Sequence, residues 1–581
     1  MAIFSLVSAA LTVGAFATAS ASETRLPSLA SRALATPTVI RVGGPSAPGD
    51  AKIAIVASDR NLGGEAFRVS AGNQTVLRGR LRAAAGTSAP WKHAFEADLS
   101  SLRRPGSYRI HAGGVSSGPW RVTAAGSSSL IPLVLRFFRT QRDGNEPALL
   151  HGPSHLHDAE VLFGPHKGQR IDMTGGWMDA GDMLHFTQTT AYVTILLQAA
   201  ARLDPVYRAA LNDEADVGVR WLLKAHPFAN LFVVQVGGDV DHDVGFRKPE
   251  TDDRSKRRGI GTRFAYSWGT KVGGDLGGRA AAALAMAAER APEPRRAQLI
   301  TAAAEWYAAG KAAGRATPAV FPNPNHPDGS GGFYVIDAWT DSIAAGAAAL
   351  YRVTGTPSYL ADAVSYLQRS RPLVSTPIYT DSIAPVAAAD ICGGLGAPGL
   401  GARAARSVAC DFLRDAAGSS LDSARENAFG PAGYFQWGTT GTSSGGGAQA
   451  AMAADAAGFR PGRRIAAGAR DWLLGRNAWG ASFIAGFGPQ NPRRIHHWAY
   501  LFGARQPIGA VVGGPAPLKQ ICEQGFGPPA GPLRTFNSGP RDCTGNIPDY
   551  ALAYEDRRDD YVTSEPAIDY AANVILLLAL L

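Results

Sequence analysis

A short glycine-rich segment carries two carboxylates three positions apart. This acidic loop runs from Gly175 to Phe186 with the sequence Gly-Gly-Trp-Met-Asp-Ala-Gly-Asp-Met-Leu-His-Phe, and its acids are Asp179 and Asp182. Glycine permits tight turns and close approach of the backbone to a ligand, so both acids can point into one cleft, where they would hold and deprotonate a water molecule. The alternative is a turn in which Asp179 caps a helix over residues 188–203. Spacing alone leaves both interpretations open.

A third acid follows a burst of charge near the C-terminus. Glu565 stands between Ser564 and Pro566, where the charged residues 554–560 lead into an apolar helix. Taken alone it is typical of a helix start, with Ser564 as the cap and the acid stabilised by the helix dipole. Together with the acidic loop it indicates glycosidic cleavage, because that reaction requires carboxyl groups on both sides of the bond.

The composition is that of a large folded protein. Of 581 residues, 45% are hydrophobic and 18% are charged, which is ample for a buried core and for more than one domain. The net charge of +9 is spread over short clusters such as residues 254–258, so nucleic acid is not expected as a partner. An anionic polymer is still possible as a substrate. We expect the protein to be a monomer.

The elements that would position these acids change character along the chain. Residues 38–122 contain short alternating segments separated by turn residues, which predicts a small β-sandwich over residues 37–125. The Gly-Ser-Ser-Ser stretch at residues 126–129 indicates a boundary. A second domain is therefore expected over residues 130–581.

Beyond the boundary the apolar residues recur at helical spacing. Ten helices are expected, over residues 189–203, 209–224, 276–291, 298–313, 338–353, 359–369, 402–416, 449–456, 465–474 and 565–581. The long loops between them are rich in glycine, aromatic and acidic residues, which is typical of a functional face. No repeat of fixed period is visible, so a solenoid is disfavoured. A helical toroid with its loops gathered at one rim fits this pattern.

The first residues indicate export. Residues 1–21 form a short apolar run that ends in small residues, as a secretory signal peptide does, and residues 22–36 would be a linker. A disordered leader rich in alanine and serine is the alternative. No segment has the roughly 18 uninterrupted apolar residues of a membrane span. We therefore expect a secreted or periplasmic protein.

Four cysteines allow three pairings, and an exported protein can form disulfides. We favour the pairs that are local in sequence, Cys392 with Cys410 and Cys522 with Cys543. The cysteines have no C-x-x-C or zinc-ligand spacing, so they give no indication of a metal site.

Three motifs resemble glycoside hydrolase family 9, which includes many secreted cellulases, and they occur in family order. Residues 175–182 resemble the catalytic loop G-G-W-x-D-A-G-D, residues 475–497 the segment that ends in His-His-Arg, and residues 554–572 the C-terminal signature with the catalytic glutamate. The strands before them resemble the immunoglobulin-like module of one branch of the family. The resemblance implies a multidomain protein, an all-β immunoglobulin-like sandwich followed by an all-α (α/α)6 barrel of twelve helices.

The resemblance also implies roles for the acids. Asp182 would be the general base, Asp179 would hold the water, and Glu565 would protonate the leaving oxygen, so that hydrolysis inverts the anomeric carbon. His496 and His497 would contact sugar hydroxyls, with a core pair as the alternative. The remaining candidates for contact with the sugar are the aromatic residues Trp177, Trp437, Trp498 and Tyr561, and a position in the core is the alternative for any one of these rings.

Departures from the family pattern bear on the sugar more than on the chemistry. Trp498 replaces the arginine after the two histidines, Ser564 and Pro566 replace Asn and Val around the acid, and Ala571 replaces an asparagine. Since the three acids are kept, we expect a β-glycan hydrolase of the endo-β-1,4-glucanase type. The alternatives are an exo-acting hydrolase of a decorated, acidic or amino-sugar β-glycan, similar to a glucosaminidase, and an inactive glycan-binding relative.

No cofactor is expected. Many members of the family bind structural calcium near a Gly-Ser-Asp-x-x-x-Glu segment, and residues 273–279 occupy the corresponding place. They end in Arg279 where the family has an acid, so calcium is not expected there. The proposed chemistry requires no metal.

Overall fold

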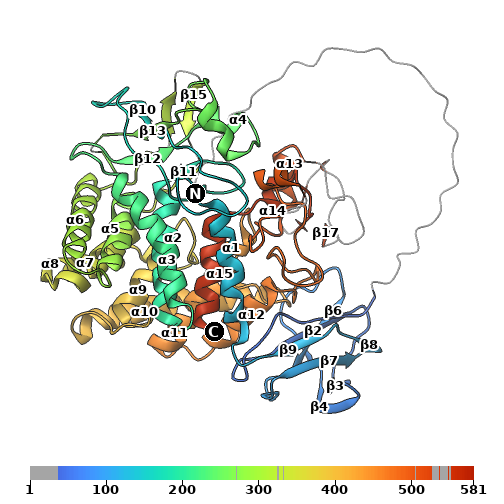
Figure 1. Cartoon of the computed structure of the whole chain (residues 1–581). Helices are drawn as coiled ribbons and strands as arrows, with labels where there is room; N and C mark the ends of the chain where they lie inside the picture. The colour runs from blue at the N-terminus through green and yellow to red at the C-terminus, as the bar shows by residue number, and fades with distance from the viewer. Residues whose placement is uncertain are drawn as a thin grey trace, which may run out of the picture. The chain divides into compact units, whose positions relative to one another are not determined.

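The computed structural model describes residues 37–269, 271–318, 320–323, 326–331, 333–503, 506–526, 535–536, 543, 547 and 551–581. The chain divides into two units, Met1–Thr36 and Pro37–Leu581. The expected signal peptide and linker make up the first unit and lie outside the described residues. The described residues all belong to the second unit, whose ribbon is coloured along the chain in Figure 1.

The second unit begins with a sandwich of two antiparallel sheets (Figure 1). One sheet has the order β1 (Val39–Arg41), β2 (Ile53–Ser58), β6 (His93–Asp98), β5 (Arg82–Ala83); the other has β4 (Gln74–Arg80), β3 (Ala66–Ala71), β7 (Gly106–Ala112), β8 (Val115–Ser116), with β9 (Trp120–Val122) paired to β7. Alternate residues such as Val56, Val69 and Ile110 are buried and form a separate core. The predicted all-β domain is confirmed.

Within the described residues, six buried helices form a closed ring, in which each contacts the next and the last contacts the first. They are α2 (Thr187–Leu203), α5 (Gly274–Ala288), α7 (Thr340–Thr354), α9 (Ala384–Cys392), α11 (Thr439–Ala457) and α15 (Ile568–Leu580). Around them pack α1 (Ile131–Gln141), α3 (Arg208–Lys224), α6 (Arg295–Ala313), α8 (Pro357–Arg369), α10 (Arg403–Glu426) and α12 (Gly462–Leu473). This is the predicted (α/α)6 barrel.

Two of these helices, α1 and α9, are absent from the sequence prediction, and the first half of α11 is absent as well. That half is rich in threonine, serine and glycine, which are poor helix formers. Close packing requires glycine at these positions: a Cβ on Gly445 would lie 1.8 Å from the carbonyl oxygen of Ile378, and one on Gly446 would lie 2.0 Å from that of Ala432. Tertiary packing therefore overrides local propensity at this position.

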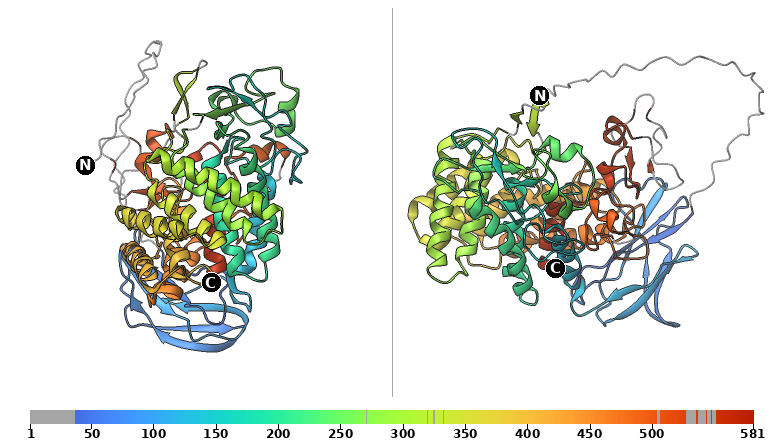
Figure 2. Two further views of the ribbon diagram at one scale, coloured as in Figure 1. Left: turned by 90° about the vertical axis from the view of Figure 1, so that its left-hand side faces the viewer. Right: turned by 45° about the horizontal axis from the view of Figure 1, so that its top comes forward.

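Smaller elements gather where the inner helices α2 and α15 begin, and Figures 1 and 2 agree in placing β10–β15 and α4 together at one end of the barrel. The strands are β10 (Glu160–Val161), β11 (His185–Phe186), β12 (Val233–Val236), β13 (Phe264–Ser267), β14 (Val320–Asn323), β15 (His326–Gly331), β16 (Ala516–Pro517), β17 (Thr535–Phe536) and β18 (Leu552–Ala553). The helices there are α4 (Asp239–Asp243), α13 (Leu518–Glu523) and α14 (Tyr561–Ser564), with the 3-10 turns η2 (Pro249–Arg254) and η4 (Trp498–Phe502). The other two 3-10 turns are η1 (Gly126–Leu130), which precedes α1, and η3 (Arg371–Leu373), which follows α8.

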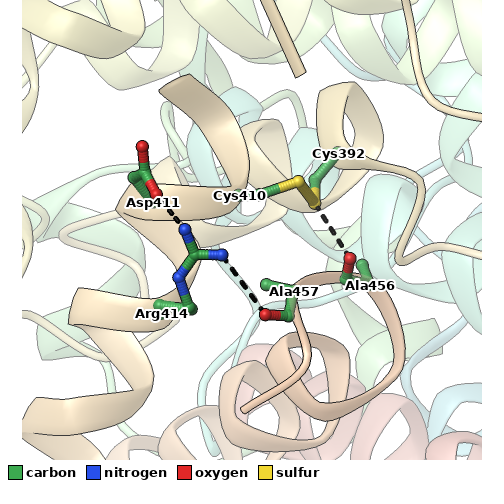
Figure 3. Close-up of a disulfide and its surroundings, with 6 residues drawn as sticks. All are labelled: Cys392, Cys410, Asp411, Arg414, Ala456 and Ala457. Atoms are coloured by element: carbon green, nitrogen blue, oxygen red, sulfur yellow. Dashed lines mark hydrogen bonds and ion pairs between the residues drawn. A yellow bond between two sulfur atoms is a disulfide. The ribbon is translucent and has the colours of Figure 1, made fainter. Parts of the chain in front are cut away.

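Both favoured disulfides occur in the structure. Cys392 at the end of α9 is bonded to Cys410 on α10, and Arg414 on α10 donates a hydrogen bond to the carbonyl oxygen of Ala457 at the end of α11 (Figure 3). Cys522 on α13 is bonded to Cys543. The first disulfide thus links an inner helix to the outer helix that follows it.

The sandwich is attached to the barrel by buried polar contacts. Arg470 on α12 has no exposed surface and forms ion pairs with Asp50 of the sandwich and with Asp471. Arg476, just after α12, donates to the carbonyl oxygen of Ile53 on β2 at 3.3 Å. The two domains therefore share one buried charged interface. In the part of the chain that the structure describes, no helix combines the length and the apolar character required to cross a membrane.

Candidate active site

A cleft of about 720 Å³ opens among the loops at the end of the barrel where α2 and α15 begin. Asp179, Asp182 and Glu565 all line it, so the fold brings together the three acids that the sequence singled out. The aromatic residues that line it are Phe186, Phe246, Phe333, Tyr334, Tyr379, Trp437, Tyr561 and Tyr570. Ring faces beside a group of acids suit a sugar, which has apolar C–H faces and polar edges.

The acidic loop binds Glu565 directly through its backbone. Gly181 N donates a hydrogen bond to Glu565 Oε1 at 3.1 Å. A Cβ on Gly181 would lie 2.3 Å from the carbonyl oxygen of His496 and 2.9 Å from Glu565 Oε1, so only glycine allows this approach. Gly175 and Gly176 adopt left-handed φ values of 91° and 81° at the start of the loop. The glycines therefore place the loop against the C-terminal acid.

Asp182 forms an ion pair with a histidine from another element. His242 on α4 donates from Nδ1 to Asp182 Oδ2 at 2.9 Å, and the backbone N of Leu184 donates to the other carboxylate oxygen at 3.2 Å. The hydrogen bond to Asp182 raises the pKa of His242 to about 9. His242 is therefore a cation at neutral pH and orients the carboxylate of Asp182.

Asp179 lies deeper and has only 3% of its surface exposed. Its carboxylate accepts hydrogen bonds from the hydroxyls of Thr189 and Tyr334. Burial raises the pKa of Asp179 to about 7, while these two hydrogen bonds act to lower it. The side chain does not cap α2, whose N-cap is Phe186 without a side-chain hydrogen bond, so the capping interpretation is wrong.

Glu565 also does not start a helix. α14 ends at Ser564, α15 begins at Ile568 with Ala567 as its N-cap, and Glu565 lies between them in extended backbone. Burial raises the pKa of its carboxyl from an ordinary 4.5 to about 8, and the negative charge of Asp182 acts in the same direction. The carboxyl is therefore protonated at neutral pH and can donate a proton.

Three of the residues expected to touch a sugar line the cleft. His496 hydrogen-bonds through Nδ1 to the carbonyl oxygen of Arg558 at 2.6 Å, and burial lowers its pKa. Trp437 and Tyr561 lie together with ring centroids 5.3 Å apart. This pair offers an aromatic surface in the cleft that also holds Glu565.

The expectation that Trp177, His497 and Trp498 contact a sugar is wrong, because they are 0%, 1% and 0% exposed. Trp177 donates from Nε1 to Glu214 Oε1 at 2.9 Å. His497 is hydrogen-bonded to Gln141, and burial lowers its pKa to about 3. Trp498 packs against Met178 and Met183 of the acidic loop. These three rings support the site from behind.

Two residues of the site were given no role from the sequence. His242 belongs to an Asp-His pair at residues 241–242, and this pair is the signal that could have found it. Tyr334 follows the β14–β15 hairpin, where no local pattern marks it, and it reaches Asp179 only through the fold.

The segment at residues 273–279 is satisfied by protein groups. Asp275 accepts hydrogen bonds from the backbone N and the hydroxyl of Thr317 at 2.7 and 2.8 Å. The buried guanidinium of Arg279 donates to the carbonyl oxygen of Thr380 at 2.7 Å and to Ser342. A cation beside this guanidinium would be repelled, so these residues do not fit calcium. Over the described part of the chain, no group of three or more histidine, cysteine, aspartate or glutamate side chains is arranged so that it could hold a metal ion.

Comparison with known proteins agrees with this architecture. The family model described as glycosyl hydrolase family 9 matches residues 128–578, and the one for the cellulase N-terminal ig-like domain matches residues 47–117. The chain belongs to glycosyl hydrolase family 9. This family membership identifies a glycoside hydrolase with an immunoglobulin-like domain ahead of its barrel.

Relatives and solved structures extend over most of the chain. Endoglucanase 3 of Oryza sativa subsp. japonica is 27% identical over 77% of this chain and 90% of its own length. The crystal structure of a metagenome-derived family 9 endoglucanase has a TM-score of 0.73 at 23% identity, covering 93% of this chain and 98% of that one. A thermostable endoglucanase from Alicyclobacillus acidocaldarius has a TM-score of 0.73 at 20% identity, covering 94% and 99%. The structural matches show the shared fold.

Proposed function

We propose that this protein is a secreted hydrolase that cleaves internal β-1,4 bonds of a glucan with inversion at the anomeric carbon. The observation that carries the proposal is that one cleft holds Glu565, whose pKa is raised by burial to about 8, together with the Asp182–His242 ion pair. Family membership and the names of the endoglucanase relatives support the substrate class. The two disulfides support export, because disulfides persist in oxidising compartments.

In the proposed reaction Asp182 is the general base and Glu565 the general acid. A water held by Asp179 and Asp182 gives a proton to Asp182 as its oxygen attacks the anomeric carbon. The bond from that carbon to the bridging oxygen breaks on the opposite face, and Glu565 gives its proton to the departing oxygen. Exchange with solvent then returns both carboxyl groups to their starting states. Each turnover consumes one water, and the new hydroxyl has the α configuration.

Sugar binding in this proposal uses the aromatic side of the cleft. Trp437 and Tyr561 would stack on C–H faces, and His496 would hydrogen-bond a hydroxyl beside the scissile bond. Aromatic surface contributes binding without demanding a particular hydroxyl pattern. The rings would therefore hold the chain, and the three acids would select the bond to be cleaved.

One observation favours a second candidate, a hydrolase of an amino-sugar β-glycan. Asp381 lines the cleft, its side chain is exposed, and among the described residues it has no hydrogen-bond or ion-pair partner. A free carboxylate in a cleft can bind the ammonium group of a glucosamine unit. This candidate keeps the same acids and changes the sugar.

A panel of substrates separates these candidates. The purified full chain is incubated with neutral, uronate-containing and amino-sugar β-glycans, products are sized by mass spectrometry, and their anomeric configuration is followed by NMR. We expect oligosaccharides of mixed length from the neutral glucan, formed first as α anomers. Monosaccharides alone would indicate exo action, and faster release from the amino-sugar polymer would favour the second candidate. β anomers would refute the inverting mechanism. No product from any glycan would favour an inactive binding protein.

A further inference from the structure

A fully buried guanidinium lies next to the acidic loop. Arg263, immediately before β13, is 0% exposed. Its Nε and Nη2 donate to Asp158 Oδ2 at 2.9 and 2.6 Å, and Nη2 also donates to Asp143 Oδ2 at 3.1 Å. Two carboxylates thus fix the guanidinium plane on one side.

The remaining nitrogen of Arg263 joins the two elements that carry the Asp182–His242 pair. Nη1 donates to the carbonyl oxygen of Met183 and lies 3.4 Å from Asp241 Oδ2. Met183 directly follows Asp182, and Asp241 directly precedes His242. One nitrogen therefore contacts the sequence neighbour of each member of the pair.

The same network holds both ends of the acidic loop. Asp143 accepts a hydrogen bond from Arg263 through its side chain, and its backbone N donates to the carbonyl oxygen of Gly176 at 3.0 Å. Its Oδ2 also accepts from Nε2 of His185 at 2.9 Å. Since Gly176 and His185 lie at the two ends of the loop, a shift of the guanidinium would be transmitted to the segment between them.

The arrangement of charged groups around Arg263 requires a planar guanidinium as well as a positive charge. Four buried carboxylates, those of Asp143, Asp158, Asp241 and Asp252, share the cations Arg263 and Arg247 together with His155. A lysine would keep the charge of Arg263. It presents three donors on a single nitrogen and cannot reproduce a planar fork that bonds in several directions.

We propose that Arg263 is a positioning residue that sets the distance and direction between Asp182 and His242 through Met183 and Asp241. The inference rests on the proposed function only in treating Asp182 as the base. The effect of Arg263 on the Asp182–His242 ion pair does not depend on turnover, and it is measured without an activity assay.

The test is Arg263→Lys in the full chain, with Arg470→Lys as the matched control. Arg470 is equally buried and also bonds two carboxylates, Asp50 and Asp471, at the sandwich interface, and it does not line the cleft. The first readout is the NMR titration of the His242 imidazole, whose signal is assigned with a His242→Asn variant. The charged groups that act on His242 are Asp182, Glu565 and Asp243.

In Arg263→Lys we expect the pKa of His242 to fall from about 9 by about one unit or more. We expect kcat to fall roughly 10- to 100-fold with KM within about twofold, because a displaced base loses transition-state stabilisation rather than ground-state binding. Arg470→Lys should change neither the pKa of His242 nor kcat. Near-UV circular dichroism confirms that each variant is folded.

An unchanged His242 titration in folded Arg263→Lys overturns the inference, as does an equal shift in Arg470→Lys. If Arg263→Lys does not fold, Asp241→Asn decides, since it weakens the contacts of Asp241 with Arg263 and Arg247 on the α4 side and leaves the contact of Arg263 with Met183 in place. A lowered pKa of His242 in that variant supports the inference, and an unchanged one overturns it. Absence of turnover in the wild type would instead reject the proposed function and leave the titration result intact.

Discussion

Gly181 N donates a hydrogen bond to Glu565 Oε1 across 384 positions of sequence. The contact requires glycine, because any Cβ at this position would lie 2.3 Å from the carbonyl oxygen of His496. The backbone between the two aspartates therefore binds the third acid directly. Displacing this one peptide group would move all three carboxyl groups relative to one another.

Gly181→Ala should accordingly reduce kcat by roughly 100-fold, because a misplacement of about 1 Å at a reacting group costs that order of rate. The matched control is Gly152→Ala, since a Cβ at Gly152 meets nothing within 4 Å. Steady-state kinetics of both variants on the same glucan provide the measurement. Equal activity of the two variants would contradict the assigned contact.

The raised pKa of Glu565 predicts an alkaline limit to activity. The acid must be protonated to act, and its pKa in the folded protein is about 8, so kcat/KM should fall as pH rises through about 8. Because this pKa lies above the ordinary 4.5, the protonated carboxyl makes its full contribution to the free energy of unfolding below about pH 4.5. That contribution is lost as pH rises through about 8. The pH profiles of kcat/KM and of urea unfolding test both statements. An alkaline limb centred below pH 6 would contradict the assignment.

Tyr334→Phe removes one of the two side-chain hydrogen bonds to Asp179. A hydrogen bond to an ionised group contributes about 1.5–3 kcal/mol, so we expect kcat to fall roughly 10- to 100-fold. The pKa of Asp179 should rise above about 7, because the Tyr334 hydrogen bond acts to lower it.

Tyr307→Phe is the matched control for Tyr334→Phe. Tyr307 makes an equivalent hydrogen bond to Asp362 at 2.7 Å, between the outer helices α6 and α8. It should affect stability at most. Kinetics that show equal loss in both variants would argue against a specific role of Tyr334.

Asp50→Ala should destabilise the whole second unit. It removes one carboxylate from Arg470, whose guanidinium is buried between the domains, and breaking a buried ion pair costs about 3–5 kcal/mol. The exposed pair of Arg464 and Glu96 spans the same interface, and Glu96→Ala should cost at most about 1 kcal/mol. Chemical denaturation of the two variants measures the difference. Similar midpoints would show that the buried contact carries no special weight.

Much of the architecture followed from patterns in the sequence. Alternating strands, helical periodicity and the family resemblance predicted the sandwich and the barrel, and the three acids converge on one cleft as expected. The helix α9 escaped because it has only nine residues and a proline in its first turn. The start of α11 escaped because its glycines are required by neighbours that are distant in sequence.

The sequence was less informative about the direction in which side chains point. Trp177 and Trp498 stand beside functional residues in the chain, yet their side chains point into the core. Adjacency in sequence does not tell which side of a loop faces the cleft. His242 and Tyr334 reach the acids from separate elements, so no local spacing could associate them. Contacts of this kind depend on how the loops are folded over the barrel.

The long separation between Gly181 and Glu565 also governs when hydrolysis can begin. The ring of inner helices closes where α15 meets α2, and Glu565, the proposed proton donor, enters the cleft just before α15. A nascent chain that has made only the acidic loop therefore has the proposed water-binding residues and lacks the proposed acid. If Glu565 is the acid, as proposed, the protein stays inactive during its own synthesis and becomes competent only when nearly all of its helices have been made and assembled.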